Sequence, residues 1–141
     1  MKQYSLNIQT RGRSITNIGG EIDRLVDQSG VNAGLCHIFI HHTSASLIIT
    51  ENADSNVRKD LETYISRLVQ DGDPAYLHDA EGPDDMAAHI RSILTQSEIS
   101  IPVCDGVLAM GTWQGIYLWE HRTSPHRRHL TVTLQGDSTN Y

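Results

Sequence analysis

GLCHIFIHH (residues 34–42) and ASLIITEN (residues 45–52) decide the fold class of this 141-residue chain. Both stretches are rich in β-branched and other apolar residues, which favours extended strands. Only Thr43 and Ser44 separate them. This short spacing predicts an antiparallel hairpin, although its turn lacks the usual glycine or asparagine.

Three other segments have the 3.6-residue periodicity of amphipathic helices. Thr16 and Asp54 are the expected N-caps of the first two, and the third begins at Pro83 with Asp84 and Asp85 in its first turn. Aliphatic side chains are expected to form the buried faces: Ile18, Ile22, Leu25 and Val26, then Val57, Leu61, Ile65 and Leu68, then Met86, Ile90, Ile93 and Leu94.

The remaining strand-like segments are residues 2–9, 98–103, 106–110, 115–122 and 127–135. Strands are grouped along the chain and do not alternate regularly with helices. A single α+β domain over residues 1–141, with a mostly antiparallel sheet, therefore fits better than a doubly wound parallel fold.

The composition narrows the class of protein. A hydrophobic content of 38% supports one core, and a net charge of −6 argues against a general nucleic-acid surface. Arginines and histidines cluster between residues 121 and 129, which suits a small anion such as phosphate. No apolar run is long enough to span a membrane, and the chain opens on a polar segment, so a cytoplasmic protein is expected. Cys36 and Cys104 are expected to be reduced and buried.

Eight histidines are many for this length. His42 ends a predicted strand, His78 lies in a loop of residues 71–82, and His89 borders the apolar stripe of the third helix. Each one alone fits a structural or solvated role. Together they could supply three neutral imidazole ligands with an open fourth position, as catalytic metal sites do. The spacing matches no zinc-finger or HExxH pattern, so both interpretations stay open.

Two further groups could belong to a pocket. Glu120 and Arg122 follow two apolar residues on one strand face, which predicts either a pocket wall or an exposed ion pair. Glycines flank Trp113 and Gln114, so this segment could approach a ligand or form a bulge. Ser44 and its neighbours contain no GxSxG elbow, which argues against a serine hydrolase.

Several motifs occur together in one order. They are HTSAS (42–46), ENAD (51–54), HDAEGPDDMAAHI (78–90), GVL (106–108), GTWQGI (111–116) and EHR (120–122). In this combination the chain resembles the YjbQ family, from the first strand to Gly136.

The resemblance implies a compact α+β fold with strands in a sandwich-like arrangement and three helices. It also implies a homotrimer packed through its sheets. The implied activity is that of a secondary thiamine-phosphate synthase, which joins a hydroxymethylpyrimidine diphosphate to a thiazole phosphate and releases pyrophosphate. The family's polar positions correspond here to His42, Ser44, Asn52, His78, Asp85, His89, Trp113, Gln114, Glu120 and Arg122.

These positions are expected to serve three roles in a transferase site. Catalysis is assigned to Glu120, Arg122 and His42. Substrate binding is assigned to Ser44, Asn52, Asp85, Trp113, Gln114 and Arg122, with the Gly111–Gly115 segment as one wall of the same cavity. A divalent metal, zinc or magnesium, is assigned to His42, His78 and His89. Two other classes remain open: a non-catalytic module that binds a small metabolite or metal, and a metal-dependent hydrolase. The expected partners are other copies of the chain and a small phosphorylated substrate, not nucleic acid or membrane.

Overall fold

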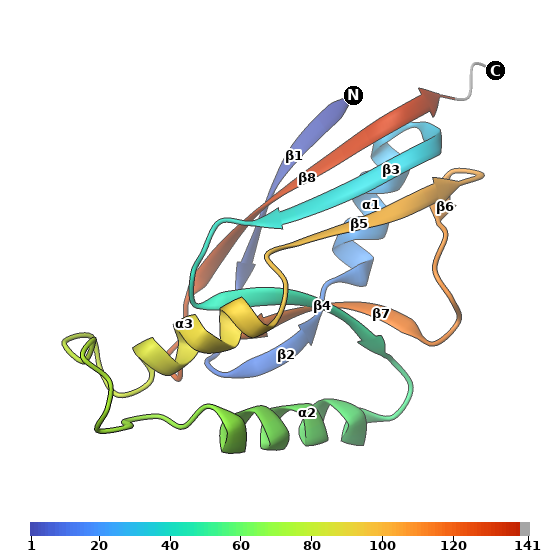
Figure 1. Ribbon diagram of the computed structural model, residues 1–141. Coiled ribbons are helices and arrows are strands. Elements are labelled where there is room, and N and C mark those ends of the chain that lie inside the picture. The colour runs from blue at the N-terminus through green and yellow to red at the C-terminus, as the bar shows by residue number, and fades with distance from the viewer. Residues whose placement is uncertain (139–141) are drawn as a thin grey trace.

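Two antiparallel sheets and three helices make up the fold (Figure 1). The computed structural model describes residues 1–138. The larger sheet has the strand order β1 (Lys2–Gln9), β8 (Arg127–Ser138), β3 (Val31–Ile40), β5 (Glu98–Cys104) and β6 (Val107–Leu108). The smaller sheet has the order β2 (Ser14–Asn17), β7 (Gln114–Glu120) and β4 (Ala45–Glu51). The helices are α1 (Gly19–Ser29), α2 (Ser55–Leu68) and α3 (Asp85–Leu94). The predicted α+β domain with mostly antiparallel strands and three helices is confirmed.

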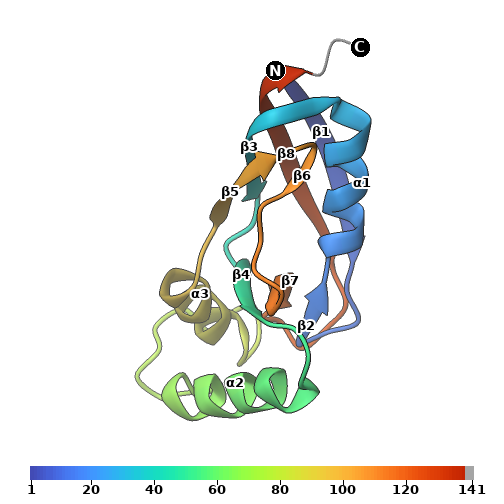
Figure 2. The same ribbon diagram turned by 90° about the vertical axis from the view of Figure 1, so that its right-hand side faces the viewer.

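The core is built from alternate residues of the larger sheet, α1 and the middle of the smaller sheet. Ile38 of β3 pairs with Val132 of β8 and Ile99 of β5, and all three are buried. Figure 2 shows α1 on one face of the larger sheet only. Side chains of opposite parity, such as Leu35 and Phe39, therefore face away from the core and are exposed.

The predicted hairpin between residues 34–42 and 45–52 is wrong, although both segments are strands. β3 pairs with β5 and β8, whereas β4 pairs with β7. Residues 41–44 carry the chain from one sheet to the other. A Thr-Ser dipeptide has no preference for the positive φ angles of a two-residue hairpin turn, so nothing local holds the two strands together.

The first helix starts later than predicted. Residues Ser14–Asn17 form β2 and pair with β7, so Ile18 is the N-cap of α1 and Thr16 does not cap it. In α2 the predicted cap is confirmed, because the Asp54 side chain accepts a hydrogen bond from Asn56 N at 2.9 Å.

The predicted apolar faces of α2 and α3 are largely wrong. Of the four aliphatic residues expected inside α2, only Ile65 is buried, because this helix lies beyond the smaller sheet (Figure 1). Ile93 of α3 is 81% exposed, and the helix instead buries Ala87, Ala88 and Arg91. The small alanines allow close approach to the sheet, and the arginine finds polar partners there.

Two remaining expectations differ in detail, and a third agrees with the structure. The segments predicted at 106–110, 115–122 and 127–135 are strands over Val107–Leu108, Gln114–Glu120 and Arg127–Ser138. Both cysteines are free, but only Cys36 is buried and Cys104 is exposed. Among residues 1–138, no helix has the length and apolar character needed to cross a membrane.

Candidate functional site

Two histidines and one aspartate meet where the long loop after α2 enters α3. Each of His78, Asp85 and His89 offers a ligand atom, and these atoms all lie within 4.8 Å of one another. His78 Nε2 lies 2.7 Å from Asp85 Oδ2, and His89 Nε2 lies 3.1 Å from the same oxygen. Asp85 and His89 are one helical turn apart and therefore share a face of α3. The loop folds back and brings His78 to that face.

Contacts around this cluster fix how its ligands point. His89 Nδ1 lies 3.0 Å from the carbonyl oxygen of Thr43, so this nitrogen carries the hydrogen and donates it. The other ring nitrogen, Nε2, faces Asp85 Oδ2. Asp85 Oδ1 accepts from Arg122 Nη1 at 2.8 Å, which leaves Oδ2 for the imidazoles. Metal-binding histidines and carboxylates are commonly oriented in this way.

The ionisation of the cluster follows from the same contacts. Burial favours neutral Asp85, but the hydrogen bond with His78 and the nearby cationic groups outweigh it and lower the pKa of Asp85. The hydrogen bond with Asp85 raises the pKa of His78. Asp84 is buried as well, yet hydrogen bonds from Thr123 N and the Arg122 guanidinium lower its pKa to about 2. Both aspartates are therefore anionic, so this end of α3 attracts cations.

The Arg122 guanidinium binds acidic groups of the protein itself. Its Nε donates to Asp84 Oδ2 at 2.9 Å, its Nη1 to Asp85 Oδ1 and its Nη2 to the carbonyl oxygen of Glu81 at 2.9 Å. Groups of the protein itself therefore occupy this guanidinium, and the binding of an anion by Arg122 beside Glu120 stays a prediction. The strand β7 ends at Glu120, so the alternation that placed both side chains on one face does not continue to Arg122.

Glu120 is fully buried and pairs with Arg128, which the sequence analysis placed only in the basic cluster of residues 121–129. Arg128 Nε donates to Glu120 Oε1 at 2.8 Å, Arg128 Nη2 donates to Oε2, and Thr10 Oγ1 donates to Oε1 at 2.7 Å. Neither a pocket wall nor an exposed ion pair describes this residue. Alternation along β8 could have revealed Arg128, because it has the same parity as the buried Leu130 and Val132.

His42 has other partners than the expected metal. Its Nε2 accepts from the backbone N–H of His129 at 2.8 Å, and its Nδ1 lies 3.4 Å from Arg128 Nη1. Burial, and then the positive charge of Arg128, lower the pKa of His42. The structure therefore groups Asp85, rather than His42, with His78 and His89. His42 remains close by, since it lines a pocket of about 340 Å³ together with His89.

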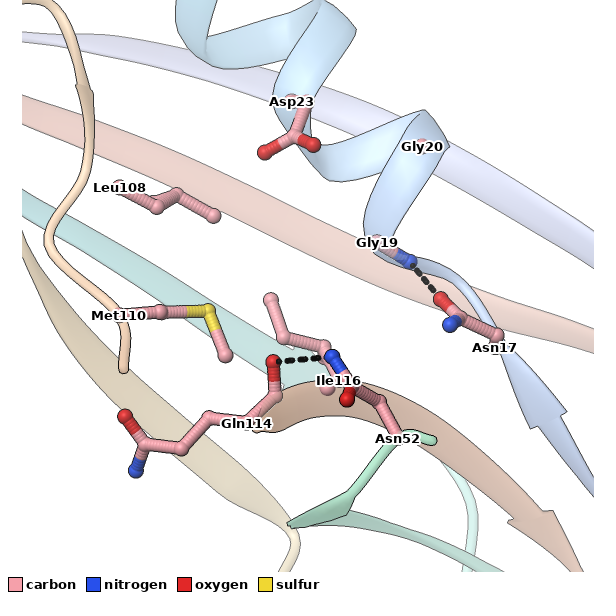
Figure 3. A pocket seen from close by; sticks show the side chains of 10 residues that line it. Asn17, Gly19, Gly20, Asp23, Asn52, Leu108, Met110, Gln114 and Ile116 are labelled. Carbon is pink, nitrogen blue, oxygen red and sulfur yellow. Dashed lines mark hydrogen bonds between the residues drawn. The ribbon is translucent and has the colours of Figure 1, made fainter. Parts of the chain in front are cut away.

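Asn52 and Gln114 lie at the other end of β7 (Figure 3), and Trp113 directly precedes that strand. Asn52 Nδ2 donates to the carbonyl oxygens of Thr112 and Gln114, at 3.2 and 3.3 Å, and Gln114 Oε1 accepts from Gly111 N at 2.7 Å. These amides hold the turn before β7, and the Trp113 side chain is exposed. A strand of 7 residues is about 20 Å long, so this segment cannot wall a cavity that contains Glu120.

A second buried network, which the sequence analysis missed, surrounds His121. Arg91 Nε donates to His121 Nδ1 at 3.1 Å, so the other ring nitrogen carries the hydrogen and donates to Ser46 Oγ at 2.7 Å. Burial and three nearby arginines lower the pKa of His121 to about 2. With Nδ1 accepting from Arg91 and Nε2 donating to Ser46, neither ring nitrogen is placed to take up the hydroxyl proton of Ser46.

Relatives of similar length match nearly the whole chain. A UPF0047 protein from Synechocystis is 49% identical over 135 residues, which cover 96% of this chain and 92% of the relative. The UPF0047 protein YjbQ of Escherichia coli is 42% identical over 136 residues, which cover 96% of this chain and 98% of the relative.

Solved structures share the fold. A YbjQ-like protein of unknown function from Sulfolobus solfataricus has a TM-score of 0.85 at 27% identity, covering 96% of this chain and 99% of that chain. A hypothetical protein from Aeropyrum pernix has a TM-score of 0.89 at 25% identity, covering 97% of this chain and 100% of that chain.

The descriptions of these relatives correct the expected activity. They state a family membership, a hypothetical protein or an unknown function, and none of them names a thiamine-phosphate synthase activity. The expectation of that synthase is therefore wrong. The sequence profile described as UPF0047 protein YjbQ-like matches residues 4–137. With that match and these relatives, the chain belongs to the YjbQ-like UPF0047 family.

Proposed function

We propose that this protein binds one divalent metal ion through His78, Asp85 and His89. The convergence of three ligand atoms carries the proposal, since one nitrogen of His78, one nitrogen of His89 and a carboxylate oxygen of Asp85 all lie within 4.8 Å of one another. His89 Nδ1 donates to Thr43 O, so Nε2 is the nitrogen that can face a metal ion, and His78 reaches the same carboxylate oxygen from the loop. The carboxylate of the cluster is buried, and Thr43 O and Arg122 orient its ligands. This arrangement supports a site that is preorganised for a metal ion.

The ligand types narrow the metal. Two imidazole nitrogens and one carboxylate oxygen suit zinc, iron or another transition metal, whereas magnesium prefers oxygen ligands and water. The side chains of His78 and His89 are 44% and 28% exposed, so one side of the cluster opens to solvent. A cation held there would supply positive charge and an open coordination position for a small anionic ligand.

Asp85→Asn is expected to weaken zinc binding at least about 100-fold. Losing even an outer-shell partner commonly costs 10–100-fold in metal affinity, and Asp85 is the central ligand of the cluster. Isothermal titration with zinc, with a chelator as competitor, measures the change.

Asp79→Asn is the matched control, because Asp79 is an exposed carboxylate of the same loop and lies outside the cluster. It should bind zinc as the unchanged protein does. Equal affinities for the two variants would contradict the proposal.

A homotrimer packed through the larger sheet is also part of the proposal. The face of this sheet away from α1 carries exposed apolar side chains, with Leu35 at 51% and Phe39 at 37% exposure. Covering such residues favours association. Light scattering coupled to gel filtration is expected to give three times the chain mass of 15.7 kDa at micromolar concentration. A monomer mass under these conditions would refute the trimer.

A further inference from the structure

His42 is surrounded by hydrogen-bond donors on both of its ring nitrogens. On one side the backbone N–H of His129 donates to Nε2 at 2.8 Å. On the other side Arg128 Nη1, which is always protonated, lies 3.4 Å from Nδ1. A neutral imidazole has one acceptor nitrogen, so it cannot satisfy both donors.

The shorter contact decides which nitrogen accepts. A backbone amide always carries its hydrogen, and 2.8 Å is a strong hydrogen bond, so Nε2 is the acceptor. Nδ1 therefore carries the ring hydrogen. This N–H and the guanidinium N–H of Arg128 Nη1 then face each other as two donors, with the two nitrogens 3.4 Å apart.

The surroundings keep Arg128 from turning away. Its Nε and Nη2 are held by the buried carboxylate of Glu120, and Nη2 also donates to Ser44 Oγ at 3.0 Å. Ser44 Oγ accepts from Arg128, so its own hydroxyl hydrogen can be donated to a ligand. It would be a third donor beside His42 Nδ1 and Arg128 Nη1. His42 and Ser44 line one hollow of about 530 Å³, through which solvent reaches this group.

We propose that an oxygen of a small oxyanion binds between His42 Nδ1 and Arg128 Nη1. Two nitrogens 3.4 Å apart can each lie about 2.9 Å from one oxygen, as in a forked hydrogen bond. Arg128 is only 3% exposed, so the oxygen enters past His42 and Ser44. Phosphate and carboxylate share the chemistry that this donor group recognises.

The position of this subsite relates it to the proposed metal site. Thr43, between His42 and Ser44, provides the carbonyl oxygen that orients His89. Residues 42–44 of the crossover from β3 to β4 thus have two roles. His42 and Ser44 provide donors for the oxyanion, and Thr43 orients a metal ligand. His42 and His89 also line a common pocket. A ligand whose oxyanion lies at His42 therefore lies beside the metal ligand His89. The donor group itself does not depend on the metal.

The tautomer of His42 is the first test. In protein labelled with ¹⁵N on histidine, the two ring nitrogens are distinguished by their chemical shifts. At pH 7.5 we expect His42 to carry hydrogen on Nδ1 and to have a bare Nε2. A bare Nδ1 would make His42 an acceptor for Arg128 and would overturn the proposal.

Binding of inorganic phosphate, acetate and phenyl phosphate is the second test, measured by titration of the same spectra. Saturable shifts of the His42 ring signals are expected with at least one of these anions, and comparing phosphate with acetate shows which oxyanion is preferred. His42→Phe is expected to weaken this binding about tenfold or more, because it removes a donor to a charged acceptor.

His37→Phe is the matched control, since the same change is made on β3, the strand that precedes His42, at a ring that bonds Glu98 and lines neither pocket of His42. Ser44→Ala, a smaller change, provides a second variant if His42→Phe does not fold. Repeating the titration in chelator-treated protein separates the two proposals: binding that survives without metal supports the oxyanion site even if no metal binds. No binding of any of the three anions, with or without zinc, or equal affinities in the two phenylalanine variants, would overturn the inference.

Discussion

Glu120→Ala is expected to lower the free energy of unfolding by about 3–5 kcal/mol, the usual cost of breaking a buried ion pair from one side. The substitution leaves the guanidinium of Arg128 buried at 3% exposure without its carboxylate partner. It also removes the acceptor of Thr10 Oγ1, which lies 2.7 Å from Glu120 Oε1. Urea denaturation followed by circular dichroism measures the change.

Glu98→Ala is the control for this experiment. Glu98 also pairs with a basic residue, His37, but its side chain is 67% exposed, so its loss should change stability by about 1 kcal/mol or less. Glu120→Gln keeps the shape and removes the charge, and it should fall between the other two variants. A Glu120→Ala protein as stable as the Glu98→Ala protein would show that the buried pair does not hold this end of the sheets together.

Arg122→Met is expected to cost about 3 kcal/mol of unfolding free energy in metal-free protein and to weaken zinc binding about 10–100-fold. Methionine keeps the apolar stem and removes three donations, to Asp84, Asp85 and the carbonyl oxygen of Glu81. Asp84, whose pKa of about 2 depends on this guanidinium and on Thr123 N, is then left with one of its two main partners. Asp85 loses the contact that turns Oδ2 toward the histidines.

Denaturation and zinc titration of one preparation give both quantities. Arg127→Met is the control, because Arg127 is exposed on β8. If Arg122 only stabilises the fold, zinc affinity will be unchanged in the folded variant while the unfolding free energy falls. If both quantities match those of Arg127→Met, Arg122 has neither role.

Local pattern was enough to predict much of the fold. Strand-like sequence predicted β1, β3, β5 and β8, and the structure buries every second side chain of β5 and of most of β8, because each strand has one covered face. Asp54 was identified as an N-cap because its side chain bonds an amide two residues away. The motif order from HTSAS to EHR indicated the family. Each of these features depends on interactions within a few residues or on a repeated spacing.

Only the tertiary structure decided the partners. The crossover at residues 41–44 put β3 and β4 into different sheets, since their hydrogen bonds go to strands far along the chain. In α3 the face that carries Ala87 and Ala88 is buried in place of the predicted aliphatic face. Asp85 is buried as well and lies with His78 and His89. Arg128 forms an ion pair with Glu120 and also contacts His42. Composition and spacing supply the charged groups, but which acid meets which base depends on burial, because an unpaired charge is costly only where water is excluded.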